Sequence, residues 1–292
     1  MLMPLVRLIS LTLFAMLCFA GNSVLCRLAF QRTGIDAASF TAIRVVSGAL
    51  MLVLLVWLRR TPRSAGKGEA RLGGNWFSAL ALMIYAAGFS FAYVSLSTGT
   101  GALLLFGAVQ ATMIAAGLRA GERFGPRQIV GLLIALAGLV IFLLPGLSAP
   151  PLGGALLMIA AGIAWGVYSL RGRGVADPAG ETAGNFVRAA PMAIALAIAL
   201  LSRQHLDSMG VLFAVLSGAL ASGIGYTAWY GALRGLTALR AASVQLSVPV
   251  LAAIAGAFFL HESLSARLIL ASVAMLGGIA LVLLNKRVPV QR

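Results

Sequence analysis

The chain has 292 residues, of which 61% are hydrophobic and only 10% are charged. A water-soluble domain cannot expose so much apolar surface, so this composition excludes an ordinary globular protein and indicates one that is integral to a membrane. The net charge of +15 would suit a nucleic-acid binder in a soluble chain, but here the basic residues lie between apolar segments and fit a role in membrane orientation.

Ten apolar segments follow one another along the chain, and most reach the ~20 residues that a membrane span requires. They cover residues 6–30, 37–58, 76–96, 100–118, 128–144, 152–170, 184–201, 211–233, 238–260 and 268–284. The first segment is too long for the apolar part of a secretory signal and ends in polar and basic residues, so we expect it to be retained as a helix. The sequence therefore predicts an all-α integral membrane protein with ten transmembrane helices.

Basic residues concentrate in alternate connections between these segments. With the N-terminus in the cytoplasm, the inner connections receive Arg59, Arg60, Arg63, Lys67, Arg71, Arg119, Arg123, Arg127, Arg171, Arg173, Arg234 and Arg240. The outer connections receive Arg27, Arg32, Arg203 and Arg267. This asymmetry is typical of membrane proteins whose positive loops stay inside. It predicts a multi-pass membrane protein with both termini in the cytoplasm, in contact with lipid and not with nucleic acid.

The two halves of the chain resemble one another. An offset of 144 residues places Arg27 on Arg171 and Arg44 on Arg188, and an offset of 140 places Glu122 on Glu262. Each half holds five spans, and because five is odd the second half must be inverted relative to the first. We expect residues 1–148 and 149–292 to form two inverted five-helix repeats around a central cavity, the arrangement that many secondary transporters use for alternating access.

Four short motifs indicate a family. Gly-Glu-Arg-Phe (121–124) and His-Glu-Ser-Leu (261–264) precede the Gly-rich last helix of each half, while Gly-Tyr-Thr-Ala-Trp (225–229) and Ser-Val-Pro-Val (247–250) fall in the eighth and ninth segments. With these motifs the whole chain resembles the EamA-type exporters of the drug/metabolite transporter superfamily. The resemblance implies export of amino acids, drugs or other metabolites, and some bacterial members export aromatic or other neutral amino acids.

Polar and aromatic side chains inside spans are the first candidates for a substrate pathway, because burying a polar group in a membrane costs free energy. Tyr85 and Phe89 share one face of a helix, since they are four residues apart. Aromatic walls with a few amide groups suit a molecule with an apolar body and a polar head. The substrate-binding candidates are Asn22, Tyr85, Phe89, Gln110, Trp165, Tyr226 and Gln245. The alternative is that these side chains only hydrogen-bond across helix contacts.

Three residues are candidates for gating or hinge motion. Pro249 removes a backbone hydrogen bond from the ninth segment, so we expect a kink there. Glu122 and Glu262 precede the last helix of each half, where a carboxylate also stabilises the positive end of a helix dipole. Both interpretations of the two glutamates, structural and gating, remain open at this stage.

Charged residues are nearly absent from the spans. The exceptions, Arg44 and Arg188, either extend to the membrane interface or bind a substrate carboxylate. All seven acidic residues fall in loops or at helix ends. This distribution argues against proton antiport through a carboxylate at the middle of the membrane and favours facilitated export.

The sequence thus predicts an exporter of small metabolites, with aromatic and other neutral amino acids as the first choice of substrate. Drugs or other metabolites of the same superfamily are the alternative, and a membrane-embedded transferase is a remote one. No motif for a metal, a nucleotide or a redox cofactor is present, so we expect no cofactor and no enzymatic activity. The oligomeric state is open, and a monomer is compatible with the sequence.

Overall fold

The computed structural model describes residues 5–59, 72–119, 125–144, 149–172, 175, 177–236 and 244–284, and these ranges contain helices and no strand. The first half comprises α1 (Leu5–Arg32), α2 (Ala37–Leu58), α3 (Trp76–Tyr93), α4 (Thr98–Arg119) and α5 (Pro126–Leu143). The second half comprises α6 (Leu152–Arg171), α7 (Pro178–Ala199), the short turn η2 (Leu201–Arg203), α8 (Ser208–Val215), η3 (Leu216–Ile224), α9 (Gly225–Leu233), α11 (Ser247–Leu260) and α12 (Ala266–Leu284).

Eight helices in the described part of the chain are long and apolar enough to cross a membrane, when α8, η3 and α9 are taken as one continuous segment. They confirm eight of the ten predicted spans, although α7 begins at Pro178 and not at residue 184 as we expected. The other two predicted spans correspond to α11 and α12, which are apolar but shorter over the searched residues. Residues 238–243, which we assigned to the ninth span, lie outside the described residues.

The distribution of side chains is the reverse of that in a soluble protein. Large apolar residues face outward, as Leu50, Phe258 and Leu270 do with exposed fractions of 67%, 74% and 70%. The interior holds small, aromatic and polar side chains, among them Gln110 and Ser217. Lipid tails solvate the apolar surface, and small residues let helices approach closely, so this arrangement is that of a membrane helix bundle.

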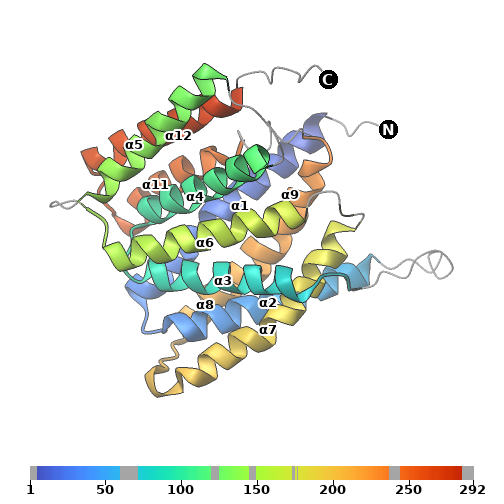
Figure 1. Ribbon diagram of the computed structural model, residues 1–292. Helices are drawn as coiled ribbons and strands as arrows, with labels where there is room; N and C mark the ends of the chain where they lie inside the picture. Colours follow the sequence, from blue (N-terminus) through green and yellow to red (C-terminus); the bar gives the residue numbers. More distant parts are fainter. Residues whose placement is uncertain are drawn as a thin grey trace.

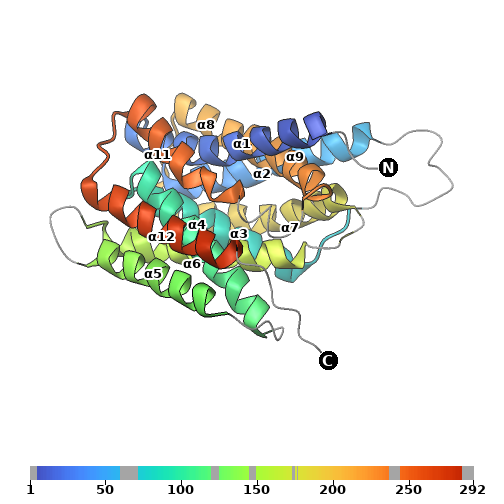
Figure 2. The same ribbon diagram turned by 90° about the horizontal axis from the view of Figure 1, so that it is seen from above.

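The helix contacts repeat when the two halves are exchanged. Helix α2 packs on α7 and α5 packs on α12, so each of these pairs joins equivalent helices of the two halves. Helix α4 packs on α6, and correspondingly α11 packs on α1. Figure 1 shows α1 running from right to left and α6 from left to right, and Figure 2 shows the helices lying along one common direction.

Side-chain caps explain where several helices begin. Asp36 accepts hydrogen bonds from the amides of Ala38 and Ser39 at the start of α2. Asn75 and Asp207 accept in the same way at the starts of α3 and α8. Such caps satisfy backbone donors that the first turn leaves free.

Glycine permits two close helix approaches next to the interior. A Cβ at Gly218 of η3 would overlap the carbonyl oxygen of Arg44 in α2, and one at Gly162 of α6 would lie 2.7 Å from Cβ of Ala108 in α4. Segment η3 has π-helical hydrogen bonding. This wider turn, which often occurs at functional sites, carries Ser217 into the interior.

Candidate functional site

A small cavity lies between helices from both halves of the chain. Its lining comes from α1, α3, α4, α6 and α9 and consists of Phe19, Asn22, Tyr85, Phe89, Leu105, Phe106, Trp165 and Tyr226. Its volume is about 10 Å³, room for a single water molecule. The side chains therefore close over the cavity in this conformation, and a metabolite can enter only when they move apart.

Aromatic rings form most of the cavity wall. The Trp165 ring lies 4.8 Å from the ring of Tyr85 and 4.8 Å from the ring of Tyr226, measured between centroids. Phe19 meets both Trp165 and Tyr226 edge to face, at 6.3 and 5.9 Å. Tilted and edge-to-face pairs are the favourable arrangements for aromatic rings, so these contacts stabilise the closed form of the cavity.

Polar groups enter the cavity wall on one side. The Tyr85 hydroxyl oxygen accepts hydrogen bonds from Asn22 Nδ2 and from the Tyr226 hydroxyl, each at 3.4 Å. Asn22 Oδ1 accepts from the Ser217 hydroxyl of η3 at 2.5 Å. The cavity thus combines an apolar body with a polar side, which is the usual composition of a small-molecule site.

The structure brings five of the seven predicted substrate-binding residues into this lining: Asn22, Tyr85, Phe89, Trp165 and Tyr226. The other two, Gln110 and Gln245, are buried but do not belong to the lining. Phe19, Leu105 and Phe106 also line the cavity, although they were not among the seven candidates. Phe19 precedes Asn22 by three residues and so shares its helix face, a signal that could have found it.

An ion pair holds together one end of the bundle. Arg27 of α1 lies with its Nε 3.3 Å from Glu262 Oε1, and its Nη1 donates to the carbonyl oxygen of Tyr93 at 3.0 Å. Glu262 Oε2 also accepts from the amide of Thr98 at the start of α4, at 2.8 Å. One carboxylate therefore connects the turn between α11 and α12 to both α1 and α4.

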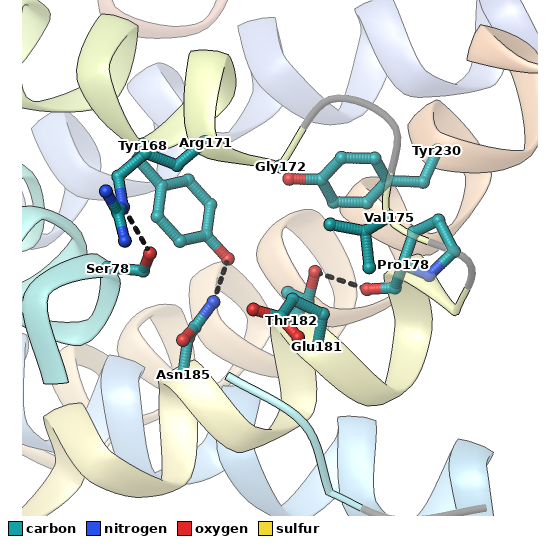
Figure 3. A pocket seen from close by; sticks show the side chains of 10 residues that line it. All are labelled: Ser78, Tyr168, Arg171, Gly172, Val175, Pro178, Glu181, Thr182, Asn185 and Tyr230. Carbon is teal, nitrogen blue, oxygen red and sulfur yellow. Dashed lines mark hydrogen bonds between the residues drawn. The ribbon is translucent and has the colours of Figure 1, made fainter. Parts of the chain in front are cut away.

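A second pocket lies at the C-terminal end of α6 (Figure 3). It is lined by Ser78, Tyr168, Arg171, Gly172, Val175, Pro178, Glu181, Thr182, Asn185 and Tyr230. Arg171 Nε donates to the Ser78 hydroxyl at 3.0 Å, and the Tyr168 hydroxyl lies 3.5 Å from Asn185 Nδ2. The Tyr168 ring is 5.6 Å from that of Trp165, so this aromatic pair separates the second pocket from the central cavity.

The predicted gating residues occupy different positions. Pro249 lies in the first turn of α11, directly after the turn at Leu246. A first-turn amide has no partner within its helix, so proline fits this position without removing a helical hydrogen bond. Glu262 lies in the ion pair described above, whereas Glu122 lies outside the described residues.

The two arginines inside spans also differ. Arg188 is half-buried and its Nη1 donates to the carbonyl oxygens of Gly73 and Gly184. Arg44 is 2% exposed and donates from Nη2 to the Tyr85 hydroxyl at 2.9 Å, so it lies beside the central cavity and does not extend to the interface. In the described part of the chain, no group of three or more His, Cys, Asp or Glu side chains could hold a metal ion.

Comparison with known proteins gives a family for both halves. The model of the EamA-like transporter family matches residues 6–144 and again residues 152–284. An uncharacterized protein of Pseudomonas aeruginosa is 58% identical over 281 residues, and the alignment covers 96% of each chain. One solved crystal structure aligns with this chain with a TM-score of 0.63 at 22% identity. The alignment covers 94% of this chain and 96% of the other, so the two proteins share the fold.

Proposed function

Since the chain belongs to the EamA-like transporter family, we propose that it exports small amphipathic metabolites by alternating access, aromatic and other large neutral amino acids first among them. The family makes it a multi-pass membrane transporter of small molecules and not an enzyme. The substrate, the direction and the mechanism of transport are our inference. The proposed location is the inner membrane, with both chain ends in the cytoplasm.

One observation supports this substrate class above the others, namely the aromatic cavity with its polar side. The ring of Trp165 packs on those of Tyr85 and Tyr226 at 4.8 Å, and in our proposal the three rings move apart to receive a planar or branched apolar side chain between them. Asn22 and the tyrosine hydroxyls supply hydrogen bonds on the polar side. A molecule that combines an apolar body with a compact polar head satisfies both parts, and a large neutral amino acid is such a molecule.

Alternating access would follow from a change at the two ends of the bundle. The ion pair between Arg27 and Glu262 closes one end, while the polar pocket at the other end is separated from the cavity by Trp165 and Tyr168. In our proposal, rocking of one repeat against the other breaks the first closure and forms a second one. Glu262, which follows the end of α11, would act as the gate, and Pro249, in the first turn of α11, would act as the hinge.

A competition experiment tests the substrate class. Liposomes that contain the purified protein are preloaded with unlabelled phenylalanine. Entry of labelled phenylalanine is then measured with unlabelled tryptophan, leucine, methionine, lysine or glutamate added outside as a competitor. We expect the neutral amino acids to compete and the charged ones not to. Trp165→Ala should lower the rate at least about tenfold, because it removes a ring that faces two others.

Phe258→Ala is the matched control, since Phe258 is 74% exposed on the lipid-facing surface of α11. It should leave the rate unchanged. If only lysine or glutamate slowed the entry of labelled phenylalanine, or if no competitor slowed it, the proposed substrate class would be contradicted. Either result would favour the drug or other-metabolite exporters of the superfamily.

A further inference from the structure

Arg44 is a charged side chain in the interior of the bundle, and no acidic side chain among the described residues forms an ion pair with it. It is 2% exposed, and its guanidinium carbon lies 4.7 Å from the centre of the Phe89 ring and 5.2 Å from that of Tyr85. Within the described residues its Nη1 is buried with no hydrogen-bond partner, and Glu262, the acid in the described salt bridge, pairs with Arg27. A buried charge that has no partner ion and leaves one of its donor nitrogens unpaired is costly unless a ligand supplies what is missing.

The polar side of the cavity has more donors than acceptors. The Tyr85 hydroxyl oxygen receives hydrogen bonds from Arg44 at 2.9 Å and from Asn22 and Tyr226 at 3.4 Å, although such an oxygen has two lone pairs. The acceptor of Asn22 is already used by Ser217. Three donors from α1, α2 and α9 therefore converge on one neutral oxygen of α3, next to the cavity.

We infer that this cluster of Asn22, Arg44, Tyr85 and Tyr226 binds the carboxylate of the substrate, with Arg44 as its counter-charge. A carboxylate brings two oxygens and about four acceptor positions, so it supplies what the cluster lacks. Arginine forms its strongest and most specific hydrogen bonds with such a group. The apolar body of the same molecule then lies among the rings of Trp165 and Phe19.

The inference rests on the proposed function for the position of the substrate, but it makes a narrower claim about chemistry. It requires a carboxylate on every substrate and makes the amino group dispensable. An aromatic amine without a carboxylate should be rejected, because it adds a further donor and a second positive charge beside Arg44. The repeat-related Arg188 has no such role, since backbone carbonyls accept from its Nη1.

The test uses two phenyl ligands that differ in their head group, hydrocinnamate and phenethylamine, and measures the thermal stability of the purified protein. We expect hydrocinnamate to raise the melting temperature of the wild type and phenethylamine to leave it unchanged. Arg44→Gln should weaken the apparent affinity for hydrocinnamate by about tenfold to a hundredfold, because it removes a hydrogen bond to a charged group. Arg44→Lys, which keeps the charge, should weaken it less.

Arg32→Gln is the control, because Arg32 is exposed and donates to the carbonyl oxygen of Phe259 far from the cavity. Ligand-free Arg44→Gln should melt at or above the wild-type temperature, since it removes an unpaired buried charge. If that variant does not fold, the two ligands on the wild type decide the matter. No binding of hydrocinnamate, equal binding of phenethylamine, or equal affinity in wild type and Arg44→Gln would overturn the inference.

The counterflow of phenylalanine separates this inference from the proposed function. Binding of hydrocinnamate that depends on Arg44, in a protein that does not exchange any amino acid, would retain the carboxylate site and reject the amino-acid substrate. Undiminished phenylalanine exchange by Arg44→Gln would retain the carrier and reject the role of Arg44.

Discussion

His261, the residue after α11, combines a side chain with a left-handed backbone conformation. Among the described residues other than glycine it alone has a positive φ, of 56°. This conformation costs an L-residue roughly 1–2 kcal/mol, and glycine adopts it freely at helix ends. We predict that His261→Gly raises the free energy of unfolding by about 0.5–1 kcal/mol, measured by thermal melting in detergent. His261→Ala, which keeps the strain, is the control, and equal stability of the two variants would contradict the prediction.

Asp36 gives a dependence of stability on pH. Partial burial raises the pKa of its carboxyl, but hydrogen bonds from Ser39, His205 and Ala38 outweigh that effect and hold the pKa below its usual value. The ionised carboxylate therefore stabilises the folded state above the ordinary aspartate pKa of about 3.9, and this contribution is lost as pH falls through the lower folded pKa.

We predict that Asp36→Ala lowers the melting temperature at pH 6 and that its difference from the wild type shrinks below about pH 4. The variant loses the cap of α2 and the contact with the amide of His205. Asp36→Asn, which keeps an acceptor but no charge, should show a loss that does not change with the titration of this carboxyl. A difference that is the same at pH 6 and pH 3 would be inconsistent with a charged cap.

Some residues at the central cavity could be predicted from the sequence, and others could not. The presence of polar and aromatic side chains inside apolar spans predicted Asn22, Tyr85, Phe89, Trp165 and Tyr226, because such side chains turn toward the interior of a bundle. The position of Arg44 could not be predicted, since a long side chain near the end of a helix can turn either way. Its contact with Tyr85 depends on how α2 packs against α3, and that packing cannot be read from either segment alone.

At the scale of elements, the connection between α11 and α12 holds α1 and α4 through Glu262. We predict that Glu262→Gln weakens this closure, because it removes the ion pair with Arg27 while retaining an acceptor for the Thr98 amide. Cys26 precedes Arg27 and is fully buried, so its thiol reports opening. With Cys18 replaced by Ala, Cys26 should react with a membrane-impermeant maleimide several-fold faster in Glu262→Gln than in the Glu262 protein.

The same protein with Cys26→Ser should show no labelling, which checks that the signal comes from this thiol. Equal labelling rates with glutamate and glutamine at position 262 would mean that the ion pair does not control access to this end of the bundle.

Helix existence was easier to predict than helix ends. Apolar runs predicted eight spans that the structure confirms by length and composition, because only a helix satisfies its own backbone inside a membrane. The early start of α7 was missed, since Glu181 was assigned to a polar loop and the span was expected to begin at residue 184. In the structure Glu181 and Asn185 accept hydrogen bonds from backbone amides of residues 74 and 75, so tertiary contacts make this polar turn part of the helix.

At the scale of the whole molecule, the acidic residues bear on the driving force. The described acids, Asp36, Asp177, Glu181, Asp207 and Glu262, all lie at or near helix ends, while Glu69 and Glu122 lie outside the described residues. We predict that exchange of phenylalanine does not change when a pH gradient is imposed across the liposome membrane, because no described carboxylate is available to carry a proton at the middle of the bundle. Steep dependence on the gradient would contradict facilitated transport.

The plan of two repeats could be predicted from the alignment of Arg27 with Arg171 and of Glu122 with Glu262, and the family matches each half separately. The equivalence of helix contacts, such as α4 on α6 and α11 on α1, needed the structure. The central cavity likewise needed the structure, because its lining comes from five helices of both halves and cannot be predicted from any one segment.

The most direct test of a carrier with an aromatic central site is counterflow of labelled phenylalanine into liposomes preloaded with the unlabelled compound. We predict a transient accumulation above equilibrium, abolished by Trp165→Ala and retained by Phe258→Ala. A simple approach to equilibrium at the same rate with and without preloading would indicate a pore, and no entry into liposomes holding folded protein would contradict amino-acid transport.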